Sequence, residues 1–123
     1  MKSTVQQVPT RTLERYRYCD CRSKSTSSRK RYRDLKEDVA RTGKFNLPVT
    51  LTFYLLDRKL LLTDGNHRLG VALELGHLTV PTVARVLNRR APKGLGAPAQ
   101  RSRLPDKPGP VSPHELLSTE ELY

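Results

Sequence analysis

The sequence predicts a compact α/β (α+β) domain with a small mixed sheet and flanking helices. Short apolar runs of strand length occur at residues 49–56 and 60–63, and another spans Thr79–Leu87. Two segments, around residues 29–42 and 66–75, instead space their apolar residues as an amphipathic helix does. At 123 residues, the chain has the length of one domain with room for a tail.

The N-terminal segment predicts an edge strand at Val5–Val8, which Pro9 ends. Residues 10–18 then interleave three arginines with Tyr16 and Tyr18. Arginine and tyrosine side chains together can contact phosphates and stack on bases. The alternative is that Leu13 and one tyrosine pack on the core while the arginines remain in solvent.

The middle of the chain predicts a helix followed by a hairpin. The helical period begins near Arg29 and ends at Gly43, and a strand starts at Leu47-Pro48. The connection at residues 57–59 is short, so this strand and the next should pair as a β-hairpin. Pro81 is tolerable near the start of the last strand, which we expect at residues 79–87.

A strand, a tight turn and a helix are expected over residues 60–76. Gly65 can adopt backbone angles that other residues avoid, and Asp64 or Asn66 could cap the helix that follows. His67 and Arg68 then lie in its first turn. Backbone N–H groups, the helix dipole and a guanidinium can converge there on an anion such as phosphate. A purely structural turn, with a cap and a paired arginine, is the alternative.

The net charge of +11 is unevenly distributed. Residues 1–33 carry +8, residues 34–90 carry +3, and residues 91–123 are neutral overall. Clustered cations favour a polyanionic partner such as DNA, or a nucleotide, although a basic arm that only aids solubility is the alternative. The expected nucleic-acid contacts are Arg15, Arg17, Arg22, Lys24, Lys30 and Arg31.

The cysteine content and the hydropathy of the chain indicate in which cellular compartment the protein is expected. Cys19 and Cys21 make neither a disulfide framework nor a four-ligand zinc site, so we expect no protein-held metal. No apolar run approaches the roughly 20 residues of a membrane span, and the N-terminus lacks the apolar region of a signal peptide. We therefore expect a cytoplasmic protein without a membrane partner.

Composition changes after residue 90. Residues 91–123 hold six of the nine prolines and three of the seven glycines, which predicts a disordered tail beyond a domain at residues 1–90. Residues 112–123 could form a short amphipathic helix whose leucines contact a protein partner, but so short a helix is marginal in water.

The motif Asp64-Gly65-Asn66-His67-Arg68, the helix after it and Leu78-Thr79-Val80-Pro81 resemble the ParB/sulfiredoxin fold. The resemblance covers about residues 5–88. It implies a stand-alone, ParB-like module that binds a nucleoside triphosphate (CTP or ATP) with Mg²⁺ and associates with DNA, in a setting such as a phage or another mobile element. The phosphate-binding residues that it implies are Gly65, Asn66, His67, Arg68, Ser27, Ser28 and Arg29.

The resemblance also has departures and alternatives. Sulfiredoxins place a catalytic cysteine where this chain has Asn66, and an amide cannot replace a thiol nucleophile, so that activity is excluded. The helix-turn-helix and dimerisation domains of chromosome-segregation ParB proteins do not fit in this length. An enzyme of the same fold (a nucleotide hydrolase, a ParB-like nuclease or a free-serine-kinase-like phosphotransferase) remains an alternative, with Asp64 and His67 as catalytic groups and Asp64 as a ligand of Mg²⁺. A remnant fold that only makes protein contacts is a third hypothesis.

Overall fold

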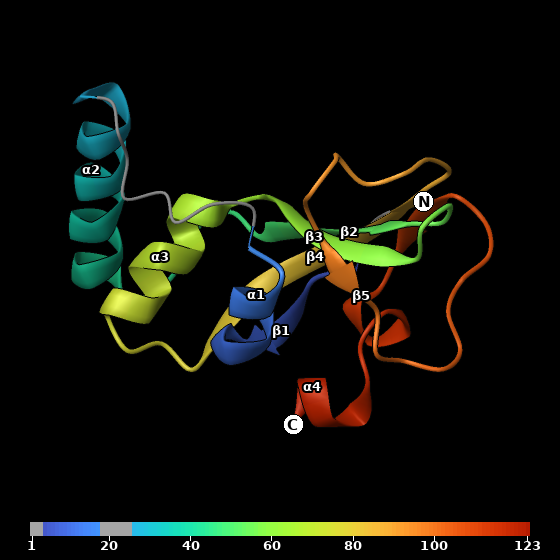
Figure 1. Cartoon of the computed structure of the whole chain (residues 1–123). Helices are drawn as coiled ribbons and strands as arrows, with labels where there is room; N and C mark the ends of the chain where they lie inside the picture. The colour runs from blue at the N-terminus through green and yellow to red at the C-terminus, as the bar shows by residue number, and fades with distance from the viewer. Residues whose placement is uncertain (1–3, 18–25) are drawn as a thin grey trace.

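A mixed sheet with helices packed against it forms the protein, as the sequence predicts (Figure 1). The computed structural model describes residues 4–17 and 26–123. Its strands are β1 Gln6–Pro9, β2 Val49–Tyr54, β3 Lys59–Asp64, β4 Thr79–Leu87, β5 Ala97–Pro98 and β6 Gly109–Val111. Its helices are α1 Thr10–Arg15, α2 Thr26–Thr42, α3 Asn66–Glu74, the 3₁₀ turn η1 Pro113–Glu115 and α4 Thr119–Leu122.

The order of strands across the sheet is β1-β4-β2-β3-β5. β2 and β3 form the predicted antiparallel hairpin, with Tyr54 opposite Lys59. β2 and β4 run parallel, and the pairing extends from Val49 opposite Thr82 to Tyr54 opposite Leu87. β1 pairs with the first half of β4 and β6 with its second half, both antiparallel.

The core lies on the face of the sheet that α1 and α3 cover. Leu51 and Phe53 of β2 contribute to this core, and Leu69 of α3 packs among them. Leu13 and Tyr16 are also buried there, which confirms the prediction that Leu13 and one tyrosine of this segment pack on the core. That segment forms a short helix, α1, which no sequence pattern predicted. α2 lies outside this core and packs on α3 (Figure 1).

The C-terminal segment differs from the disordered tail that its composition predicts. Leu116 and Leu117 are fully buried in the core, and β5 and β6 pair with the sheet. Ser118 caps α4 with its side chain, and the Glu121 carboxylate accepts a hydrogen bond from the Ser118 N–H. The leucines that were expected to contact a partner therefore pack on this chain. The free energy gained by burying two large apolar side chains offsets the conformational entropy lost when a proline-rich segment becomes ordered.

In the described part of the chain, no helix combines the length and the apolar character that crossing a bilayer requires.

Candidate functional site

A sharp turn at Gly65 connects β3 to α3. Gly65 is the N-cap of α3 and has a φ of 93°, a left-handed conformation that side chains disfavour. A Cβ atom at this position would lie 2.4 Å from Val49 Cγ1. The Gly65 carbonyl accepts the first helical hydrogen bond, from the Leu69 N–H, at 2.9 Å. Close packing on β2 and the backbone angle therefore both require glycine where α3 begins.

The expected side-chain caps of α3 are replaced by other contacts. The N-cap is Gly65, which has no side chain, so the prediction that Asp64 or Asn66 caps this helix is wrong. Asn66 Nδ2 instead donates to the Leu62 carbonyl at 3.1 Å, beneath the turn. The Asp64 carboxylate is exposed, and its Oδ2 lies 3.8 Å from Arg68 Nη1. The first turn of α3 thus presents its backbone donors without a cap from the N-cap residue.

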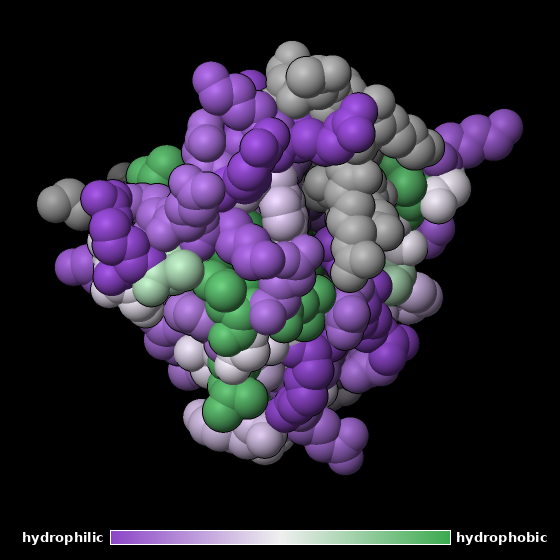
Figure 2. Space-filling model, turned by 90° about the vertical axis from the view of Figure 1, so that its left-hand side faces the viewer, coloured by the Kyte–Doolittle hydropathy of each residue, from purple (hydrophilic) through white to green (hydrophobic). Residues whose placement is uncertain are grey.

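A pocket of about 320 Å³ lies between this turn, α2 and the loop after α2. Its polar side comes from the turn and from two α2 residues, and its apolar side from α2 and residues 45–47. The lining residues are Arg31, Leu35, Asp38, Val39, Phe45, Asn46, Leu47, Asp64, Gly65, His67 and Arg68. Figure 2 shows this side of the molecule, where hydrophilic side chains surround a small hydrophobic area.

Arg68 has a structural contact as well as a place in the pocket. Its Nη1 donates to the Pro48 carbonyl at 3.1 Å, which ties α3 to the residue before β2. The side chain is only 21% exposed. A guanidinium has five N–H groups, so this contact leaves donors for a ligand. Arg68 therefore both holds the turn and contributes positive charge to the pocket.

The surroundings of His67 disfavour its protonated form. Burial lowers the pKa of its imidazole from 6.5, and the positive charges of Arg31 and Arg68 lower it further. Its ring centroid lies 6.2 Å from that of Tyr32, and its buried Nε2 has no hydrogen-bond partner among the described residues. An orphaned ring nitrogen at an uncapped helix start is the arrangement that an oxyanion ligand would complete.

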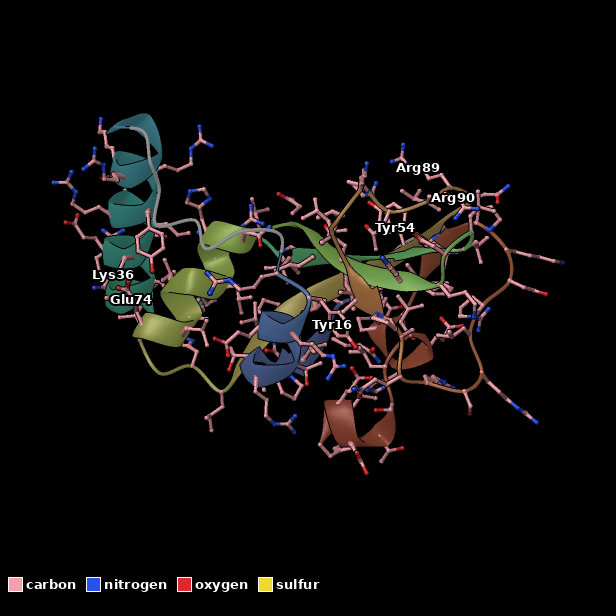
Figure 3. The ribbon with its side chains drawn as sticks, in the orientation of Figure 1. Tyr16, Lys36, Tyr54, Glu74, Arg89 and Arg90 are labelled. Atoms are coloured by element: carbon pink, nitrogen blue, oxygen red, sulfur yellow. The ribbon has the colours of Figure 1, made fainter. Side chains whose placement is uncertain are left out.

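The α2 wall of the pocket is held by contacts with α3. Lys36 Nζ and Glu74 Oε2 form an ion pair at 2.8 Å between the two helices (Figure 3). A Cβ at Gly70 would lie 3.0 Å from Tyr32 Cε2, so glycine there allows the tyrosine ring to approach α3 closely. Asp38 pairs with Arg41 at 2.6 Å and lines the pocket from the same helix. The first two of these contacts hold α2, which carries Arg31, against α3.

The structure brings together some of the predicted site residues. Asp64, Gly65, His67 and Arg68 share the pocket, and so does Arg31, which was expected to contact nucleic acid. Asn66 is buried beneath the turn and does not line the pocket.

The other predicted residues lie elsewhere or outside the described part of the chain. Arg29 and Lys30 are exposed on α2. The backbone of Arg17 forms an isolated parallel β-bridge with Leu62 of β3. With the Gln100 amide oxygen turned toward it, Arg15 donates hydrogen bonds of 3.0 and 2.7 Å to the C-terminal segment. Outside the described residues lie Cys19, Cys21, Arg22, Lys24 and the side chains of Ser27 and Ser28.

Sequence reasoning missed the apolar wall of the pocket. Leu35 and Val39 lie in the segment for which the sequence predicted an amphipathic helix, but nothing in the sequence indicated that its apolar face meets the Gly65 turn. Phe45 and Leu47 lie in the loop that leads into β2, and the periodicity of apolar residues says little about the position of loop side chains.

Within residues 4–17 and 26–123, no group of three or more His, Cys, Asp or Glu side chains gathers as a metal site would. Comparisons of the chain with protein-family models, curated proteins and solved structures give no significant match.

Proposed function

We propose that this protein is a ParB-like module that binds the phosphate groups of a nucleotide in the pocket at the Gly65 turn and associates with DNA. One observation carries the first part: Arg31, His67 and Arg68 line one pocket together with the N-terminus of α3. Guanidinium groups and helix N–H donors are the groups that bind phosphate oxygens in proteins.

The pocket has two chemically different sides, as a nucleotide has. Leu35, Val39 and Phe45 offer apolar surface to a base or ribose, and the turn offers donors to phosphates. Two carboxylates, Asp38 and Asp64, line the same pocket and would repel a bare phosphate. Carboxylates and phosphates together are ligands that Mg²⁺ accepts, so these two groups would hold the ion beside the nucleotide.

Isothermal titration with CTP, ATP, ADP and GTP, each with Mg²⁺, tests the proposal. Arg31→Ala removes a charge from the pocket without touching the Arg68–Pro48 contact, so its affinity for the bound nucleotide should fall about tenfold. Arg33→Ala is the matched control, because Arg33 is exposed on α2 and does not line the pocket. Chelation of Mg²⁺ should weaken binding in the unmodified protein.

Two results would count against the proposal. If none of the four nucleotides binds, the proposal that the pocket binds a nucleotide is wrong. Equal losses for Arg31→Ala and Arg33→Ala would show that only the overall positive charge matters, and not the pocket.

A phosphotransferase of the same fold is the second candidate. Asp38 lies in the pocket with His67 and Asp64, whereas its neighbour Glu37 does not line it. An aspartate beside bound phosphates can accept the proton of an attacking hydroxyl. Release of nucleoside diphosphate in the presence of free serine, lost in Asp38→Asn, would favour this candidate over a module that only binds.

A further inference from the structure

The ends of β2 and β4 place two loops side by side, at the end of the hairpin away from the pocket. The two strands are parallel and finish together, with Tyr54 opposite Leu87. The pairing continues beyond them, because the Leu55 N–H donates to the Leu87 carbonyl at 3.0 Å. The Leu56 N–H then donates to the Arg89 carbonyl at 3.4 Å. The chain after β2 and the chain after β4 are thus adjacent.

Five cations lie in these two loops and at the first residue of β3, and we call this surface the basic end. It consists of Arg58, Lys59, Arg89, Arg90 and Lys93. All except the half-buried Lys59 are exposed. Among the described residues, none of the five forms an ion pair with a carboxylate. Figure 3 shows Arg89 and Arg90 at the opposite end of the molecule from Lys36 and Glu74.

The nearby acid joins the loops and does not neutralise the cations by pairing with them. Asp57 Oδ2 accepts a hydrogen bond from the Ala91 N–H at 3.1 Å, which ties the β2–β3 turn to the chain after β4. Arg58 has a φ of 54°, and its guanidinium carbon lies 5.9 Å from the centre of the Phe53 ring. The Arg58 carbonyl also accepts from the Ala99 N–H at 3.2 Å. The cations therefore stand on a fixed backbone, which reduces the entropy lost on binding.

We propose that the basic end binds the phosphate backbone of nucleic acid. Clustered, unpaired cations on a rigid turn match the regular negative charge of a nucleic-acid strand. Three of the five are arginines, whose planar guanidinium binds phosphate oxygens in pairs. A lipid surface fits less well, because Leu56 is the one exposed large apolar residue in these loops and no amphipathic helix lies there.

This surface is separate from the nucleotide pocket. The pocket opens where β2 begins and β3 ends, and the basic end lies where β2 ends and β3 begins. Six strand residues separate the two ends, which corresponds to about 17 Å. The inference rests on the DNA association proposed above and names its surface, and it stands even where the pocket binds no nucleotide.

Fluorescence anisotropy of a labelled DNA duplex, titrated with the full chain, tests the proposal. Arg89→Glu/Arg90→Glu should weaken binding by about tenfold to a hundredfold near 0.1 M salt, and should reduce the slope of log affinity against log salt by about 2. Arg33→Glu/Lys44→Glu is the matched control: it makes the same change in net charge on exposed residues of α2 and of the loop just after it, and neither residue is an expected nucleic-acid contact. Its binding should change much less.

Several outcomes would overturn the proposal. Equal losses in the two variants would indicate attraction by net charge alone, and a larger loss in Arg33→Glu/Lys44→Glu would place the contact at α2 and the loop after it. Binding to vesicles of anionic lipid that exceeds binding to duplex DNA or to a matched RNA would identify a lipid surface. Unchanged circular dichroism and unchanged nucleotide titration in Arg89→Glu/Arg90→Glu show that neither the fold nor the pocket accounts for a loss.

Discussion

The Tyr16 hydroxyl donates a hydrogen bond to Glu121 Oε2, joining α1 to α4 across 105 residues of chain. Both groups are buried. Thr12 Oγ1 donates to the Glu121 carbonyl beside them, and Arg11 Nη1 donates to the Glu120 carbonyl at 3.4 Å. The last turn of the chain is therefore attached to the first helix by polar contacts as well as by the buried leucines that precede it.

We expect Glu121→Ala to lower the free energy of unfolding by about 1.5–3 kcal/mol, because it removes a charged partner from a buried hydroxyl. Tyr16→Phe removes the same hydrogen bond and keeps the ring. Urea denaturation of both single variants and of the double variant gives the coupling energy. Strictly additive losses would mean that the two side chains do not interact.

Stability should also fall at alkaline pH through Tyr16. Burial, followed by the hydrogen bond and the negative charge of Glu121, raises the pKa of Tyr16 above its ordinary value of 10. The unfolded chain then releases this proton from about pH 10 upward while the folded chain retains it, so the free energy of unfolding decreases as the pH rises. In Tyr16→Phe this part of the alkaline decrease should be absent when unfolding is followed across that range. An identical pH profile for the variant would contradict the prediction.

Gly65→Ala should be far more destabilising than alanine at another glycine of positive φ. Gly43→Ala is the matched control, since Gly43 has a φ of 78° and no atom within 4 Å of an added Cβ. The control should cost about 1–2 kcal/mol for the backbone angle alone. Gly65→Ala adds the clash with Val49, which overpacking data place at about 1–3 kcal/mol more. Equal thermal unfolding midpoints for the two variants would show that β2 shifts to accept the methyl group.

The sequence predicted the elements whose patterns are local. β4 has the predicted bounds, Thr79–Leu87, and the β2–β3 hairpin follows from alternating residues on either side of a short connection. α2 begins three residues before the expected Arg29. The turn at Gly65 was expected because only glycine accepts its geometry without strain.

The parts that the sequence did not predict depend on contacts between distant segments. Residues 91–123 were expected to be disordered because their composition as a whole is rich in proline and glycine. That average does not show that Leu116 and Leu117 pack into the core, which they do only when the sheet is present. The pocket was not predicted because it forms only where α2 packs closely on α3. That close packing depends on the missing side chain of Gly70, which leaves room for the Tyr32 ring. The basic end was missed because Arg58 and Arg89 are 31 positions apart and are united only by the parallel pairing of β2 and β4.

His67 should make the protein less stable in acid and should link nucleotide binding to pH. Burial, Arg31 and Arg68 lower the pKa of this imidazole in the folded chain, whereas the unfolded chain retains a value near 6.5. As the pH falls below 6.5, His67 binds a proton in the unfolded chain but not yet in the folded chain. The free energy of unfolding therefore decreases until the pH reaches the lowered pKa of His67 in the folded chain. His67→Gln should reduce this decrease, which thermal unfolding between about pH 5 and 8 would measure.

A bound phosphate reverses the electrostatics around His67, because its negative charge offsets that of the two arginines and stabilises the imidazolium. Nucleotide affinity should therefore rise as the pH falls through the range in which only the bound protein protonates His67, and binding should take up protons there, which titration in buffers of different ionisation enthalpy detects. The same experiment on His67→Gln should show a weaker pH dependence and a smaller proton uptake. If the unmodified protein binds nucleotide with neither effect, the phosphate does not lie against the imidazole, and the backbone donors of α3 hold it together with Arg31 and Arg68.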